Sequence, residues 1–111
     1  MEIKDKQVDG VTVLSLDGSI DAITAPEITE FIQAQIAKGN TKLVVDLSGV
    51  DYTSSAGLRV LLGAIKETRA QSGDLRLAGI QPDVQKVLTL SGFTNILKTF
   101  DSTDAAVASY S

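Results

Sequence analysis

Residues 42–65 read KLVVDLSGVDYTSSAGLRVLLGAI, a sequence in which a strand pattern is followed by a helix pattern. Its first part, Lys42 to Leu47, is short and rich in branched apolar residues, which is typical of a strand. Hydroxyl residues occupy positions 52–55, and the apolar residues after them recur at the spacing of one helix face. These apolar residues are Leu58, Leu61, Leu62 and Ile65. The stretch therefore predicts a strand, a polar loop over residues 49–55 and an amphipathic helix that begins near Ala56.

The segment upstream of this stretch predicts a pair of strands. Residues 3–8 and 11–16 are short segments separated by the dipeptide Asp9-Gly10. This dipeptide readily takes the positive φ angles of a type I′ turn, which joins antiparallel strands tightly. We therefore expect an antiparallel hairpin at the N-terminus.

Further helices are predicted where helix-starting residues stand before amphipathic segments. Thr24 and Glu27 have the spacing of a capping box, in which each side chain binds the backbone N–H of the other residue. The helix that they begin is expected to end at Gly39. Pro82 is expected to open another helix, and an alanine-rich helix is expected from about Thr103.

The strand patterns predict how the layers are arranged. Additional strands are expected at residues 75–78 and 96–100, so strands and helices alternate along most of the chain. Apolar and polar residues alternate within the strands, which is typical of a sheet covered mainly on one face. The apolar set is Leu14, Leu16, Leu43, Val45, Leu47, Leu75 and Leu77. We predict one α/β domain over residues 1–111, with an open, mostly parallel sheet of four to five strands, an antiparallel first strand and helices mainly on one face.

The composition argues against several classes of protein. The chain has no cysteine and no histidine, which removes disulfides, thiolate metal sites and the commonest general base. Its net charge is −4 and its basic residues are scattered, which argues against a nucleic-acid partner. The charged N-terminus does not resemble a signal peptide, and no uncharged run approaches the roughly 18 residues of a membrane span. A cytoplasmic protein without a metal or cofactor is expected.

Ser54 and Ser55 are the strongest candidates for a functional site. They stand directly before the predicted helix, in a loop that leaves one of the parallel strands, and such loops meet at one edge of a sheet. The free N–H groups and the dipole of a helix N-terminus favour an anion, so a phosphate on either hydroxyl would be stabilised there. The alternative interpretation, that one of the serines is only a helix N-cap, stays open at this point.

Three segments of the chain carry a resemblance to a known family. Residues 51–62, DYTSSAGLRVLL, are preceded by LVVDL at residues 43–47. Residues 16–25 read LDGSIDAITA, and residues 87–93 read VLTLSGF. In this order and at these intervals, the segments resemble the motifs of the STAS domain family of bacterial anti-sigma factor antagonists.

The resemblance implies a protein that is not an enzyme and that acts by partner switching. A dephosphorylated antagonist of this kind binds an anti-sigma factor that is also a serine kinase, and so releases a sigma factor. Phosphorylation reverses the binding, and a serine phosphatase restores it. The motif aligns Ser55 with the phosphoacceptor and Asp21 with an acidic loop residue beside it. The partner-binding residues that the resemblance implies are Asp21, Thr53, Ser54, Ser55, Ala56, Gly57 and Arg59.

Departures from the family pattern leave alternatives open. Ser54 stands where the family has Asp before the acceptor, and Ala56 stands where it has a second hydroxyl. Ser54 is therefore the alternative acceptor, and the alternative function is that of a non-phosphorylated STAS adaptor or subunit of a signalling or transport complex. Gly57 is expected to permit a close approach, either within the chain or by a partner.

Other functions find less support in the residues. A serine nucleophile needs a base, and without histidine the substitute would be a lysine such as Lys66. The glycine-rich signatures of nucleotide-binding loops are absent. A receiver domain would use Asp46 as its phosphoacceptor, but the acidic pair and the lysine that it also needs are not convincingly present.

Overall fold

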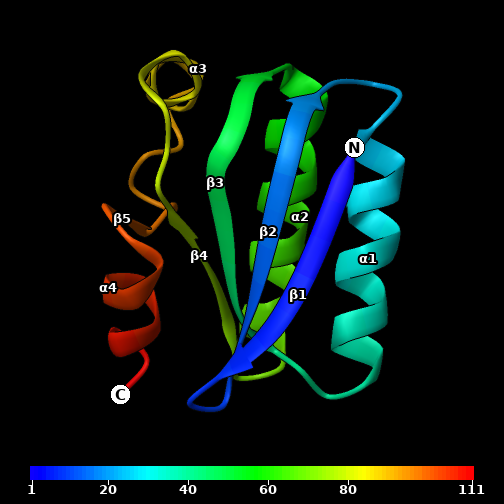
Figure 1. Cartoon of the computed structure of the whole chain (residues 1–111), viewed down its shortest axis with the longest axis vertical. Coiled ribbons are helices and arrows are strands. Elements are labelled where there is room, and N and C mark those ends of the chain that lie inside the picture. Colours follow the sequence, from blue (N-terminus) through cyan, green and yellow to red (C-terminus); the bar gives the residue numbers. More distant parts are fainter.

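The computed structural model describes all 111 residues and contains one five-stranded sheet of order β1-β2-β3-β4-β5 (Figure 1). The strands are β1 (Glu2–Val8), β2 (Val11–Ile20), β3 (Lys42–Thr53), β4 (Asp74–Ala78) and β5 (Thr99–Phe100). β1 is antiparallel to β2, and the remaining neighbours are parallel. Asp9 and Gly10 have φ angles of 52° and 80°. The predicted hairpin and the predicted fold class are both confirmed.

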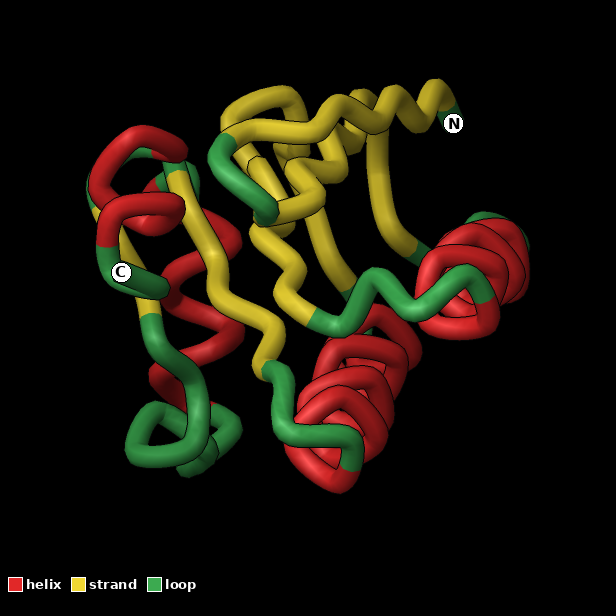
Figure 2. Tube along the Cα trace, turned by 90° about the horizontal axis from the view of Figure 1, so that it is seen from below, coloured by secondary structure: helices red, strands yellow, loops and turns green.

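The helices lie mainly on one face of this sheet, as the alternating strand patterns predicted. They are α1 (Ala25–Ala37), α2 (Ser55–Ala70), α3 (Pro82–Leu90) and α4 (Thr103–Ala108). Figure 2 shows α1 and α2 side by side below the sheet. Each parallel strand is added next to its predecessor, so the right-handed connections through α1, α2 and α3 reach the same face.

Two apolar clusters hold the layers together. All seven strand residues predicted to be apolar and inward-facing belong to the larger cluster, together with residues from α1, α2 and α3. The smaller cluster lies on the opposite face, where Ala106 and Val107 of α4 pack against β2, β3 and β4. This second face is therefore apolar where α4 covers it, whereas Asp17 and Ser48 further along it are exposed.

The strands that lead to the predicted site are longer than expected. β2 continues to Ile20 and β3 to Thr53, although the sequence predicted a loop over residues 49–55. The reason is that the two polar segments pair with each other, from Asp17 beside Gly49 to Ile20 beside Thr53. The sequence predicted a last strand over residues 96–100, whereas β5 contains only Thr99–Phe100.

Candidate functional site

The ends of β2 and β3 bring two sequence-distant segments together. Ile20 is paired with Thr53, and the Ser54 N–H donates a hydrogen bond to the Ile20 carbonyl at 2.8 Å. Both strands end at the upper edge of Figure 1, where the connections to α1 and α2 begin. Asp21, the residue after Ile20, is therefore held next to the start of α2, as the sequence predicted.

The two serines have different roles in the local structure. Ser54 has an extended backbone and caps α2, because its Oγ accepts a hydrogen bond from the Ala56 N–H at 3.2 Å. Ser55 is the first helical residue, is exposed and takes no part in the hydrogen bonds of this cap. The N-cap interpretation therefore applies to Ser54, and the hydroxyl of Ser55 is free to react or to meet a partner.

Asp21 caps the turn that leads into α1. Its Oδ1 accepts hydrogen bonds from the Ile23 N–H at 2.9 Å and the Thr24 N–H at 3.0 Å, and the Thr24 Oγ1 accepts one from the Asp21 N–H at 3.0 Å. These backbone donors hold the pKa of the Asp21 carboxyl below its ordinary value, so the group is a fixed negative charge at neutral pH.

The predicted capping box of Thr24 and Glu27 is wrong. A reciprocal box does form, but it joins Asp21 to Thr24, three positions earlier than expected. Thr24 already has a helical backbone and makes no side-chain cap to α1. Its hydroxyl instead donates to the Ser19 carbonyl at 2.9 Å, which ties the turn to the end of β2.

Two of the predicted partner-binding residues lie beneath the surface rather than on it. Thr53 is only 3% exposed, and its Oγ1 donates to the Ser54 carbonyl at 3.1 Å. Gly57 is also buried, and a Cβ on it would overlap Thr53 Oγ1 and lie 2.7 Å from Ile20 Cγ2. The close approach that Gly57 permits is thus between α2 and its own sheet. These residues set the position of the first helical turn.

Two exposed apolar side chains beside the serines escaped the sequence analysis. Ile23 is 82% exposed and Tyr52 is 53% exposed. The sequence placed Tyr52 only in the run of hydroxyl residues and gave Ile23 no role, because the exposure of a large side chain at these positions is set by tertiary packing. Arg59 is exposed as well, one helical turn after Ser55. We call the exposed and half-exposed residues at this corner the serine edge, which consists of Asp21, Ile23, Tyr52, Ser54, Ser55, Ala56 and Arg59.

The chemistry of the serine edge is that of a contact surface with one free serine hydroxyl. Lys66, the lysine that could replace histidine as a base, lies three turns along α2 from Ser55, a rise of about 16 Å. No group of three acidic side chains is placed to hold a metal ion. Asp46, considered as a receiver-type acceptor, lies within β3, where its Oδ1 accepts a hydrogen bond from the Ser48 N–H at 3.0 Å.

None of the helices combines the length and apolar character that crossing a bilayer requires. Among known proteins, BtrV of Bordetella bronchiseptica is 36% identical over 110 residues, which are 99% of this chain and 95% of BtrV. The anti-sigma-B factor antagonist of Listeria monocytogenes is 32% identical over 98 residues, 88% of this chain and 85% of that protein.

A solved structure shares the fold. The crystal structure of an anti-sigma factor antagonist from Mycobacterium paratuberculosis superposes with a TM-score of 0.88 at 28% identity, covering 97% of this chain and 92% of the other. The family model described as the STAS domain matches residues 2–106. That match includes both strand ends, the capped turn and the serine pair, so the resemblance of the motifs is confirmed and the chain belongs to the STAS domain family.

Proposed function

We propose that this chain is an anti-sigma factor antagonist that acts by partner switching in the cytoplasm. The serine edge binds an anti-sigma factor with serine kinase activity, that kinase phosphorylates Ser55, and a serine phosphatase reverses the modification. The observation that carries the proposal is the contrast between the two serines: Ser54 is engaged as the cap of α2, whereas Ser55 is exposed. The relatives named as anti-sigma factor antagonists support the same role.

The surroundings of Ser55 explain how a phosphate changes binding without refolding the domain. A phosphate adds about −1.5 to −2 charges and is compatible with the first turn of α2, where the helix dipole favours an anion. Arg59 stands at i+4 and can approach it on the same helix face. Asp21 nearby is already ionised. The modification therefore changes the charge of the surface that the partner must cover, while α2 stays in place.

The acceptor assignment is tested by incubating the purified chain with ATP and the anti-sigma factor kinase of the same organism. Peptide mass spectrometry then locates the phosphate. We expect the phosphate on Ser55 in the wild-type chain and in Ser54→Ala, and no phosphate in Ser55→Ala. A phosphate on Ser54, or no phosphate on the wild-type chain, overturns the assignment of Ser55 as the acceptor.

Binding measurements separate the switch from the alternative adaptor function. Ser55→Asp is expected to weaken binding to the anti-sigma factor by about tenfold or more, since a charge is added to a surface that becomes desolvated. Ser55→Ala is expected to bind like the unmodified chain. Equal binding by both variants would favour the alternative function, that of a non-phosphorylated adaptor. That alternative arose because Ser54 stands where the family has Asp.

A further inference from the structure

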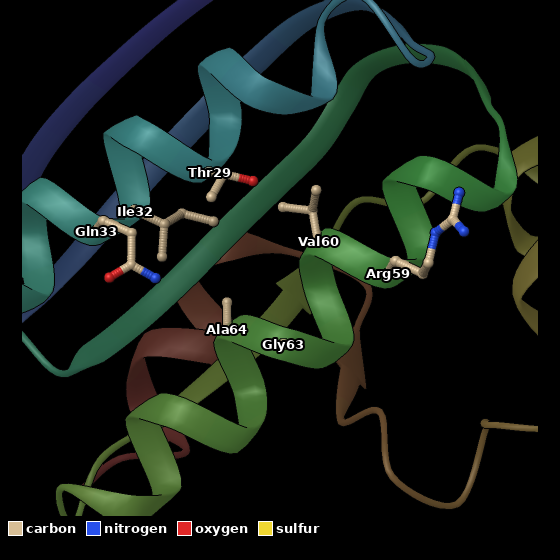
Figure 3. A pocket seen from close by; sticks show the side chains of 7 residues that line it. All are labelled: Thr29, Ile32, Gln33, Arg59, Val60, Gly63 and Ala64. Atoms are coloured by element: carbon tan, nitrogen blue, oxygen red, sulfur yellow. The ribbon is translucent and has the colours of Figure 1, made fainter.

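The first two helices leave an open groove between them, next to the serine edge. Its volume is about 250 Å³. Figure 3 shows Ile32 of α1 facing Val60 and Ala64 of α2 across this space. The complete lining is Thr29, Ile32, Gln33, Arg59, Val60, Gly63 and Ala64. The middle of the groove is thus apolar, and we call it the α1/α2 groove.

Gly63 lines this groove, and the packing of the chain itself does not require a glycine there. Gly63 is exposed in the interior of α2, where glycine is less favourable than alanine. Apart from its chain neighbours and the backbone of its own helix, a Cβ on Gly63 would have no atom within 4 Å, in contrast to Gly57, whose Cβ would overlap Thr53. The absent side chain therefore leaves room for an atom from outside the chain.

Arg59 joins the groove to the serine edge. It lines the groove and belongs to the serine edge, and Figure 3 shows its guanidinium extending toward the first turn of α2. Arg59 is exposed and is absent from the ion pairs of the chain, all of which involve other residues. On the opposite side, Gln33 Nε2 donates a hydrogen bond to Glu67 Oε2 at 2.6 Å and bridges the two helices.

We propose that the α1/α2 groove is a second contact for the same anti-sigma factor that meets the serine edge. An apolar side chain of that partner fills the space over Gly63, and a neighbouring carboxylate pairs with Arg59. This inference rests on the proposed function, because continuity with the serine edge identifies the occupant. An unpaired arginine beside an apolar hollow is matched by a segment that carries both an apolar and an acidic side chain.

Filling the groove from the inside tests the proposal. Gly63→Leu is expected to weaken binding of the purified anti-sigma factor by about tenfold or more, and Gly63→Ala by a smaller factor. Gly63→Ala is also expected to raise the melting temperature, so its weaker binding cannot result from unfolding. Ala70→Leu adds apolar bulk at the exposed end of the same helix, outside the groove, and is expected to bind like the unmodified chain.

The charged part of the contact has its own measurement. Arg59→Gln is expected to lower the affinity and to reduce its dependence on salt, because the paired carboxylate loses its counter-charge. Arg59→Glu is expected to lower the affinity further through repulsion. If both variants bind like the unmodified chain, no carboxylate of the partner contacts Arg59 and the proposal is wrong.

The outcomes distinguish this inference from the proposed function. If the unmodified chain does not bind the anti-sigma factor, the proposed function fails. If it binds and Ser55→Asp weakens the complex while Gly63→Leu does not, only the groove contact is overturned. The remaining possible occupant of the groove is a second copy of this chain, which sedimentation velocity of the chain alone would detect. Self-association that Gly63→Leu abolishes would assign the groove to that second copy and overturn the inference.

Discussion

Gly57 and Gly63 lie in the same helix but have opposite surroundings. A Cβ at position 57 would overlap Thr53 Oγ1 and crowd Ile20, whereas a Cβ at position 63 would touch nothing within 4 Å beyond its chain neighbours and the backbone of its own helix. Gly57→Ala is expected to lower the free energy of unfolding by about 1–3 kcal/mol through overpacking. Gly63→Ala is expected to raise it by up to about 1 kcal/mol through helix propensity. Urea denaturation measures both, and a shift of the two variants in the same direction would contradict this packing.

The serine pair gives a second prediction at the scale of single residues. Ser54→Ala removes the hydroxyl that caps α2 and is expected to cost about 1 kcal/mol of stability. Ser55→Ala removes an exposed hydroxyl and is expected to change stability by less than about 0.5 kcal/mol. Thermal or urea unfolding measures both. Under the proposed function, Ser55→Ala abolishes phosphorylation, whereas Ser54→Ala does not. One pair of variants therefore separates the structural serine from the regulatory one.

Asp74, the first residue of β4, connects several elements through its carboxylate. Arg69 at the end of α2 donates to it at 2.9 Å, Arg76 of β4 donates at 3.2 Å, and Lys98 before β5 lies at 3.6 Å. Burial disfavours the charged form of Asp74, but the hydrogen bonds from the two arginines and from the Leu75 N–H outweigh this effect. They hold the pKa of Asp74 below its ordinary value.

Asp74→Asn is therefore expected to lower stability at neutral pH by about 2 kcal/mol, because hydrogen bonds to a charged group are lost. A carboxyl whose pKa is depressed by folding contributes stability above its unfolded pKa of about 4, and this contribution is lost as the pH falls through the folded pKa. Asp74→Asn should thus lose less further stability on acidification than the unmodified chain. Urea denaturation at several acidic pH values measures this, with the exposed Glu30→Gln as control.

At the scale of elements, the patterns that are local in sequence were predictable. The Asp9-Gly10 turn and the period of α2 depend on neighbouring residues, and both are confirmed. The extension of β3 through residues 48–53 was not predictable, because this polar, glycine-containing segment is held by pairing with the equally polar end of β2. The correct cap was missed for a similar reason: the Ser19 carbonyl, outside the motif, engages the Thr24 hydroxyl.

For the candidate site, too, the features that are local in sequence were predictable and those set by tertiary packing were not. The position of the serines at a helix start was a local pattern, and the approach of Asp21 followed from parallel strand order. The burial of Thr53 and the exposure of Ile23 depend on how α1 and α2 meet the sheet. Sequence therefore located the serine edge but could not distinguish the residues of its surface from those of its support.

At the scale of the whole molecule, the two ends of the sheet have separate roles. The serine edge stands where β2 and β3 end, whereas the chain terminus is fixed near the starts of β3 and β4. There the Tyr110 hydroxyl lies 2.7 Å from the Leu43 carbonyl and 2.8 Å from the Asp74 carbonyl. The Arg76 guanidinium stacks over its ring at 3.9 Å from the centroid. We call these contacts of Tyr110 with Leu43, Asp74 and Arg76 the C-terminal lock. A partner can cover the serine edge without disturbing it.

Tyr110 also gives the lock a pH dependence. Burial, reinforced by the nearby charge of Asp74, raises the pKa of the Tyr110 hydroxyl above its ordinary value of 10.0. A group whose pKa is raised by folding contributes stability that is complete below its unfolded pKa and is lost as the pH rises through the folded pKa. The free energy of unfolding is therefore expected to fall above pH 10, and Tyr110→Phe should lack this part of the loss.

The measurement uses the fact that the chain has two tyrosines and no tryptophan. In Tyr52→Phe, the tyrosinate absorbance reports Tyr110 alone, and its half-ionisation is expected clearly above pH 10 in the folded protein and near pH 10 in urea. Tyr52→Phe should keep the alkaline loss of stability, since Tyr52 is outside the lock. Half-ionisation of Tyr110 at the same pH in both states would mean that its hydroxyl is not held against β3 and β4, and that α4 is not fixed to the sheet through this residue.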